Sequence, residues 1–202
     1  PSPAPAEMDF CMKTQLEAAR DGILTPEMRQ VAGAEYLAPE FIRDEIAAGR
    51  LVIPANPAHT HLKPIGIGRK LRTKINANIG NSSLSSDEGQ ELAKLEIAIR
   101  YGADTVMDLS TGPRVNEIRA AILAHSEAPI GTVPIYQALA RVEDPMDLDI
   151  GLLLEVIREQ AGQGVDYMTI HAGLLMRHIP DARKRLTGIV SFDKVLDEGL
   201  VV

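Results

Sequence analysis

Polar side chains gather at the ends of four apolar segments of this sequence, at 74–79, 104–109, 130–136 and 166–171. A neutral imidazole at such an end could hold a phosphate or move a proton. Hydroxyls and glycines in a turn before a helix could present N–H groups to a phosphate, although an N-cap and turn without a ligand is the commoner use of such residues. The side chains and turn residues in question are Asn76, Asn78, Gly80, Asn81, Ser82, Ser83, Met107, Asp108, Ser110, Thr111, Gly112, Thr132, Pro134, Tyr136, Gln137, Thr169, His171 and Gly173.

The first of these segments contains two asparagines, which are depleted in strands. Asn76 and Asn78 are two residues apart, so a strand places both on the same face. One interpretation is that they cap a neighbouring loop. We favour binding, because a buried amide needs hydrogen-bond partners and a ligand can supply them.

Other chemistries find less support. His59 and His61 form a His-x-His pattern that can bind zinc, but no cysteine or acidic ligand lies nearby in the sequence, so we expect no metal site there. Cys11 is the single cysteine, which excludes a disulfide framework and a cysteine-cluster metal site built by this chain alone. The sequence contains no P-loop, no Cys-x-x-Cys pair and no Ser/His/Asp order typical of hydrolases.

The elements that must position these residues alternate between strands and helices. Amphipathic helices are predicted at 87–101, 114–125 and 149–163, and a fifth strand is possible at 187–191. This alternation predicts parallel βα units. An internal repeat supports it: residues 101–107 and 163–169 each place a glycine, then an aspartate, before a strand. The pattern alone does not distinguish a doubly wound sheet from half of an eight-stranded barrel.

The first 72 residues follow a different pattern, so we predict a mainly helical region at 1–72 and the βα region at 73–202. Helices are predicted at 8–22, from Pro26 with Thr25 as N-cap, and at 39–48. A short strand is expected at 51–54, followed by a proline-rich and glycine-rich loop at 54–68.

Composition limits the possible environments and partners. The chain has 202 residues, of which 45% are hydrophobic and 24% charged, as in ordinary globular proteins. A net charge of −7 argues against nucleic-acid binding. No apolar run approaches the roughly 20 residues that cross a bilayer, and the start of the chain does not resemble a signal peptide. We therefore expect a cytoplasmic protein without membrane contact.

Four stretches taken together resemble one enzyme family. They are residues 75–82 (INANIGNS), 104–112 (DTVMDLSTG), 131–138 (GTVPIYQA) and 164–173 (GVDYMTIHAG), and shorter likenesses occur at 39–44 and 52–56. In this order and spacing they resemble the phosphomethylpyrimidine synthases, which are non-canonical radical S-adenosylmethionine enzymes of thiamine biosynthesis. The resemblance covers about residues 12–191 and matches the N-terminal half of that family.

The resemblance implies the first half, about four to five βα units, of a (β/α)₈ barrel. It implies a homodimeric lyase that rearranges 5-aminoimidazole ribotide to 4-amino-5-hydroxymethyl-2-methylpyrimidine phosphate. It also implies S-adenosylmethionine, a [4Fe-4S] cluster and a zinc ion as cofactors. Carried over by position, the substrate contacts are Asn78, Met107, Tyr136, His171 and Ser191; the resemblance assigns no catalytic residue or metal ligand within this chain.

The sequence departs from the family after Ser191. The family continues with Ser-Arg-Gly-Gly, but here Phe192, Asp193 and Lys194 follow. The cysteine motif of the cluster and the histidines of the metal site are missing, so we expect the chain alone to be inactive. Three alternatives stay open: a synthase of 5-hydroxybenzimidazole for cobamides from the same ribotide, a non-catalytic subunit completed by another chain, and a gene fragment.

Overall fold

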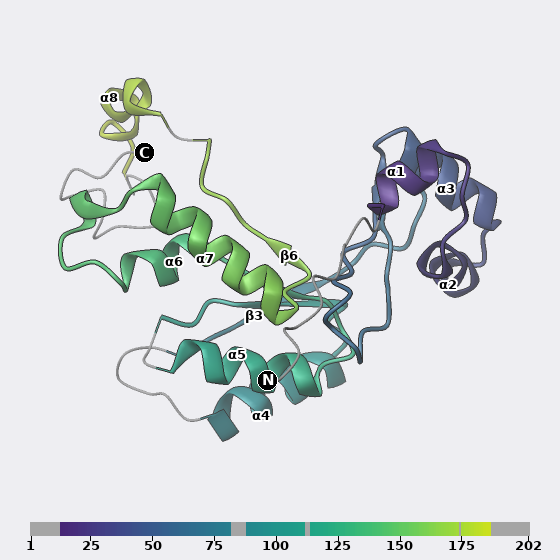
Figure 1. The fold of residues 1–202 in the computed structure, drawn as a ribbon, viewed down its shortest axis with the longest axis horizontal. Coiled ribbons are helices and arrows are strands. Elements are labelled where there is room, and N and C mark those ends of the chain that lie inside the picture. Colours follow the sequence, from purple (N-terminus) through teal and green to yellow (C-terminus); the bar gives the residue numbers. More distant parts are fainter. Residues whose placement is uncertain (1–12, 82–87, 112–113, 174, 187–202) are drawn as a thin grey trace, which may run out of the picture. The chain divides into compact units, whose positions relative to one another are not determined.

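The computed structural model describes residues 13–81, 88–111, 114–173 and 175–186 (Figure 1). The chain divides into two compact units. The described part of the first comprises residues 13–54 and 64–73, and the second comprises 55–63 and the described residues from 74 onward. Within those residues, no helix combines the length and the apolar character that a membrane span requires.

The first unit holds three helices and a short ribbon. The helices are α1 (Gln15–Arg20), α2 (Pro26–Glu35) and α3 (Pro39–Ala47). The strands β1 (Leu51–Val52) and β2 (Ile67–Gly68) pair antiparallel. The predicted N-cap of α2 is confirmed, since the Thr25 side chain accepts from the Met28 N–H, and the first helix begins after Thr14, which forms a capping box with Glu17. Of the helix predicted at 8–22, residues 8–12 lie outside the described residues.

The ribbon corrects one prediction, because β2 lies inside the stretch expected to be loop. Gly68 pairs with Leu51, and a Cβ at Gly68 would lie 2.7 Å from the Arg50 carbonyl oxygen. This close approach of the two backbones requires glycine at position 68. The sequence analysis had interpreted the same glycine as a sign of a loop.

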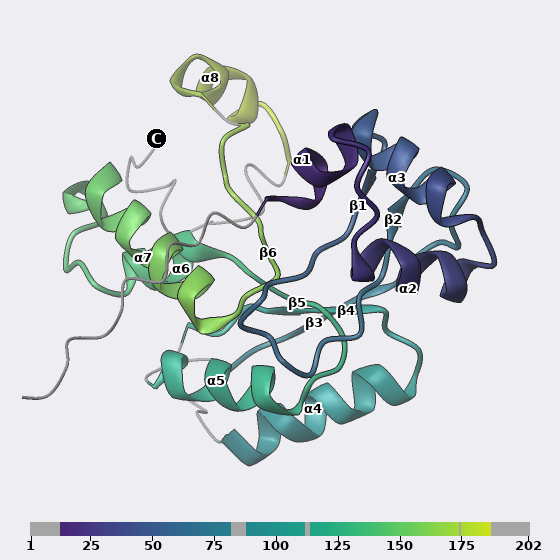
Figure 2. The ribbon, with the colours of Figure 1, turned by 45° about the vertical axis from the view of Figure 1, so that its right-hand side comes forward.

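The second unit is a parallel α/β layer, as predicted. Its sheet has the order β3-β4-β5-β6, with every neighbouring pair parallel. The strands are β3 (Asn76–Ile79), β4 (Thr105–Asp108), β5 (Ile130–Thr132) and β6 (Tyr167–Met168). The helices are α4 (Glu88–Arg100), α5 (Val115–His125), α6 (Pro134–Leu139), α7 (Ile150–Gln163) and α8 (Ile179–Ala182), with 3-10 turns at Pro145–Asp147 and Met176–His178. Figure 2 shows helices α4 and α5 together on one side of the strands.

The third strand is shorter than predicted. It was expected to run over 130–136, but β5 ends at Thr132 and α6 begins at Pro134. Proline lacks the N–H that a sheet ladder needs, and its fixed φ suits the first position of a helix. The apolar run predicted one long strand because a buried strand and a short buried helix have the same hydrophobic character. The possible fifth strand at 187–191 lies outside the described residues.

The two faces of the sheet have opposite character. On one face Ile79, Val106 and Ile130 pack in an apolar core together with residues of α4 and α5, including Leu95 and Ile118. Successive side chains of a strand point to opposite faces. The alternate positions, including Asn76, Asn78, Met107 and Tyr167, therefore lie on the other face, which we call the open face.

The internal repeat of the sequence places two aspartates, Asp104 and Asp166, in equivalent contacts. Each contact, which we call an aspartate clamp, joins two neighbouring strands. Asp104 accepts a hydrogen bond from the Ile75 N–H at 2.8 Å and donates its own N–H to the Ile75 carbonyl. Asp166 does the same with Ile130, accepting at 2.8 Å and donating at 2.9 Å. Each clamp ties the start of one strand to the start of a preceding strand, at the amino-terminal end of the sheet.

Candidate functional site

The open face carries a row of hydrogen-bonded polar side chains. Tyr167 donates from its hydroxyl to Asn76 Oδ1 at 2.8 Å, and Thr105 donates to the same oxygen at 2.9 Å. Asn76 Nδ2 then donates to Asn78 Oδ1 at 2.9 Å. The prediction that both asparagines share a face is confirmed. The side-chain oxygen of Asn76 and one of its amide N–H groups are hydrogen-bonded within the protein. In contrast, no described residue forms a hydrogen bond with the amide nitrogen of Asn78.

Tyr167 lies across the open face because its neighbour on β5 has no side chain. Gly131 is its register partner, and a Cβ there would lie 2.2 Å from the tyrosine ring. The ring therefore occupies the space above Gly131. Burial raises the pKa of the Tyr167 hydroxyl, so it stays a hydrogen-bond donor at neutral pH.

The residues that the resemblance names as substrate contacts occur in two neighbouring pairs. Asn78 and Met107 are register partners on β3 and β4. Tyr136 in the first turn of α6 and His171, which follows β6, have ring centroids 6.1 Å apart with an interplanar angle of 35°. Asn78 and Met107 are each the second-to-last residue of a strand, and Tyr136 and His171 follow the next two strands of the same sheet. The fifth, Ser191, lies outside the described residues.

Three predicted site residues instead face the helices, where they are buried. None of the three, Asp108, Thr132 and Gln137, is more than 5% exposed. They belong to a polar network between α5, α6 and α7. Asp108 does not share the face of Met107, because successive residues of a strand point to opposite faces. Ser110 is also buried and donates to Asp108 Oδ1 from both its N–H and its hydroxyl.

Arg119 at the centre of this network was not anticipated. Its side chain is 3% exposed, and its Nε lies 3.9 Å from Asp108 Oδ2. Its Nη atoms donate to Gln163 Oε1 at 2.8 Å and to Gln137 Oε1 at 2.9 Å. Burial lowers the pKa of Arg119 and raises that of Asp108, although Ser110 and Arg119 oppose the shift at Asp108. The sequence did contain one sign of this role: Arg119 follows Ile118 on the apolar stripe of the predicted helix, where a charged residue needs buried partners.

A pocket of about 460 Å³ lies between the start of α5 and the end of α6. It is lined by Arg114 and Arg141, but each arginine forms an ion pair with a glutamate, Glu117 and Glu159 respectively. The positive charge of the pocket is thereby balanced, which does not favour an anionic ligand.

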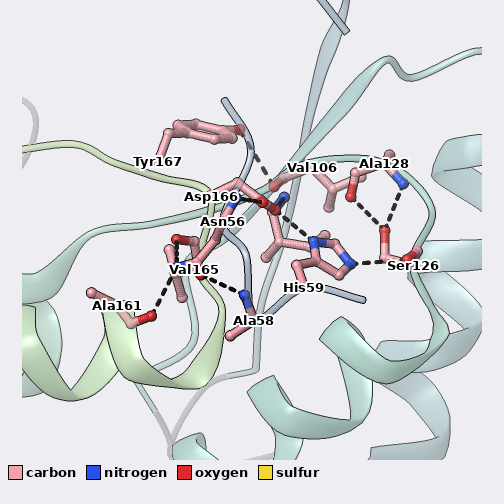
Figure 3. Close-up of polar contacts among 11 residues, drawn as sticks. Asn56, Ala58, His59, Val106, Ser126, Ala128, Ala161, Val165, Asp166 and Tyr167 are labelled. Atoms are coloured by element: carbon pink, nitrogen blue, oxygen red, sulfur yellow. Dashed lines mark hydrogen bonds and ion pairs between the residues drawn. The ribbon is translucent and has the colours of Figure 1, made fainter. Parts of the chain in front are cut away.

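His59 is buried in a structural contact rather than a metal site (Figure 3). Its Nδ1 lies 2.7 Å from Asp166 Oδ2, and its Nε2 lies 3.0 Å from the carbonyl of Ser126, the C-cap of α5. A carbonyl oxygen only accepts, and the same carboxylate oxygen already accepts from Ile130 N–H. Both ring nitrogens therefore carry hydrogen, and the ring is an imidazolium at a helix C-terminus.

Asn56 completes the same contact, so residues 55–63 are attached to the end of the sheet. Its backbone N–H donates to Asp166 Oδ1 at 2.8 Å, and its side chain donates to the carbonyls of Ala161 and Val165 (Figure 3). Ala161 lies in the last turn of α7, where carbonyls lack partners within the helix. Contacts across more than 100 residues leave no local sequence signal.

The charge of His59 predicts a pH dependence of stability. Burial lowers its pKa, but the hydrogen bonds and charge of Asp166 and the backbone carbonyls outweigh this and raise it above the ordinary 6.5. The pair thus contributes its full stability below about pH 6.5 and loses it as the pH rises through the raised folded value. In urea titrations from pH 6 to 9, the free energy of unfolding of the wild type should fall toward that of His59→Gln. A gap between them that is constant or widens with pH would contradict this assignment.

The comparisons with known proteins place the chain in a family. Residues 14–194 match the Radical SAM ThiC family. The chain belongs to this family. The phosphomethylpyrimidine synthase of Haloarcula marismortui is 56% identical over 178 residues, covering 88% of this chain and 37% of that protein. The phosphomethylpyrimidine synthase of Halobacterium salinarum strain R1 is 54% identical over 180 residues, covering 89% and 38%. The chain therefore spans under two fifths of the length of these curated relatives.

Membership of the Radical SAM ThiC family implies S-adenosylmethionine and an iron–sulfur cluster. The residues of this chain do not fit the cluster, because its thiolate ligands require several cysteines and the sequence has one, Cys11. Among the described residues, no three His, Cys, Asp or Glu side chains converge as a metal site would require. What the described residues of this chain do show is the row of hydrogen-bonded polar side chains on the open face.

Proposed function

We propose that this chain forms the ribotide-binding part of a phosphomethylpyrimidine synthase of thiamine biosynthesis, a lyase that uses radical S-adenosylmethionine chemistry. Two observations support the proposal: the relatives at 54–56% identity carry that name, and residues 14–194 match the radical family. Ligands for the cluster and for zinc would come from protein beyond these 202 residues.

We further propose that the four strands are part of a (β/α)₈ barrel. Their order in the sheet follows their order in the chain without reversal. A doubly wound sheet would reverse direction at a switch point. Ile79, Val106 and Ile130 pack toward the helices, and Gln160 of α7 bonds Thr132 on that same side. Helices on one face and a polar open face on the other are the layout of a barrel wall, with the open face inside.

The substrate proposed is 5-aminoimidazole ribotide, held by Asn78, Met107, Tyr136, His171 and Ser191. The observation that carries this is the grouping of four of these residues as two neighbouring pairs at the carboxyl ends of adjacent strands. Active sites of barrels lie at that end. The Asn78 amide can donate to a ring nitrogen, Met107 supplies a half-buried apolar contact, and His171 beside Tyr136 suits a phosphate or a planar ring.

Alanine at Asn78 or at His171 should weaken ribotide binding by this chain. Each replacement removes one polar contact, which costs about 1–3 kcal/mol of binding free energy. Isothermal titration of the 202-residue chain with synthetic ribotide measures the effect. His125→Ala is the matched control, because His125 is an exposed histidine at the end of α5. The ribotide is also the starting compound for 5-hydroxybenzimidazole, so this test does not depend on the product.

Two results would overturn the proposal. One is a wild-type chain that is folded by circular dichroism and yet shows no ribotide binding. The other is wild-type affinity in both Asn78→Ala and His171→Ala.

A further inference from the structure

We infer that Gln137 is a positioning residue that sets the place of the Tyr136 ring beside His171. The role in binding rests on the proposed ribotide site, whereas the position of the ring can be tested without any ligand. Gln137 follows Tyr136 directly on α6, a helix of six residues. Tyr136 is half-buried and Gln137 is 5% exposed.

The Gln137 amide is bonded on both of its ends, by residues from two other helices. Its Oε1 accepts from Arg119 Nη2 of α5 at 2.9 Å and from Gln160 Nε2 of α7 at 2.8 Å. Its Nε2 donates to Asn116 Oδ1 of α5 at 3.0 Å. These three bonds come from both neighbouring helices, so they hold α6 against rotation as well as displacement.

The network is in turn anchored to the sheet. Gln160 Oε1 accepts from the hydroxyl of Thr132 at 2.6 Å, and Thr132 is the last residue of β5, two residues before α6 begins. Arg119 Nη1 also donates to Gln163 Oε1 at 2.8 Å. The orientation of α6 is therefore defined relative to β5, α5 and α7 at once.

Successive residues of a helix lie about 100° apart around its axis. A rotation of α6 that moved the Tyr136 ring would thus move Gln137 by the same angle and break its directional bonds. An apolar residue at 137 would fill the core but would not define one rotation, because apolar packing has no direction. This explains why a glutamine is buried at 5% exposure next to a candidate substrate contact.

The test replaces Gln137 by methionine, which is of similar length but cannot form the bonds. We expect the nuclear Overhauser contacts between the Tyr136 and His171 rings to be lost and the Tyr136 ring shifts to change. Gln137→Glu keeps an oxygen facing Arg119 and Gln160 and should retain those contacts. Gln160→Met removes one of the three bonds to Gln137, so it should weaken the contacts between the two rings to an intermediate degree. This variant replaces Gln137→Met in the test if Gln137→Met does not fold.

Leu95→Ala provides the matched control, because it destabilises the apolar core from α4 without touching the amide network. It should leave the contacts between the two rings intact. In the same variants, the ribotide dissociation constant should rise about tenfold for Gln137→Met and stay near wild type for Gln137→Glu.

Unchanged ring contacts in folded Gln137→Met, or equal loss in Leu95→Ala, would overturn the inference whether or not the wild type binds ribotide. Ring contacts that respond as expected in a wild-type chain that does not bind ribotide would instead refute the proposed function and leave the positioning role supported.

Discussion

Replacing Asp166 by alanine will lower the free energy of unfolding by about 3–5 kcal/mol, the range for removing one partner of a buried ion pair. Its side chain is fully buried and accepts from His59 Nδ1 at 2.7 Å and from the backbone N–H groups of Ile130 and Asn56, each at 2.8 Å. Alanine leaves a buried imidazolium and two buried N–H groups without their partner. Urea denaturation at pH 6, where the histidine is charged, measures the loss.

Asp104→Ala is the matched control for this prediction. Asp104 forms the same clamp to its neighbouring strand through Ile75, but it is half-buried, whereas the side chain of Asp166 is fully buried and also bonds His59. We expect a loss of about 1 kcal/mol there, as for one ordinary hydrogen bond. Similar losses in the two variants would mean that the contribution of Asp166 to the free energy of unfolding comes from the clamp alone and that the His59 contact contributes little.

The two aspartates also show what could be predicted from the sequence. Their likeness was visible as a repeat, and the parallel pairing of the strands followed from the alternation of strands and helices. What Asp166 binds was not visible, because His59 and Asn56 lie more than 100 residues away in a proline-rich loop. Local periodicity reports which face of an element is apolar, but it does not report which distant loop is attached to its end.

The candidate site was predicted by position along the strands and only partly by face. The two-residue spacing of Asn76 and Asn78 placed both correctly on the open face. Asp108 and Thr132 were grouped with them because they also end strands, yet alternation turns them toward the helices. Thus polar residues near a strand end divide into one set on the open face and one set that faces the helices. The helix-facing set forms the support on which the proposed position of Tyr136 depends.

Arg119→Met tests how strongly that support holds the second unit together. The substitution keeps the apolar stem but removes the buried charge facing Asp108 Oδ2 at 3.9 Å, together with the bonds to Gln163 and Gln137. We expect a loss of about 3–5 kcal/mol in the free energy of unfolding at pH 8, because a buried carboxylate loses its counter-charge. Arg100→Met, which breaks an exposed pair with Glu96, should cost below about 1 kcal/mol.

The loss in Arg119→Met should also depend on pH, in a direction set by Asp108. Burial already raises the pKa of this carboxyl, and Arg119 is one of the groups that lower it. Without the guanidinium the folded pKa rises further, so Asp108 protonates at a higher pH and then needs no counter-charge. A carboxyl whose pKa is raised by folding loses stability as the pH rises through the folded value. The gap between variant and wild type should therefore be smaller at pH 5 than at pH 8. A gap that is independent of pH would show that the cost arises from the lost hydrogen bonds of Gln137 and Gln163 rather than from the stranded charge.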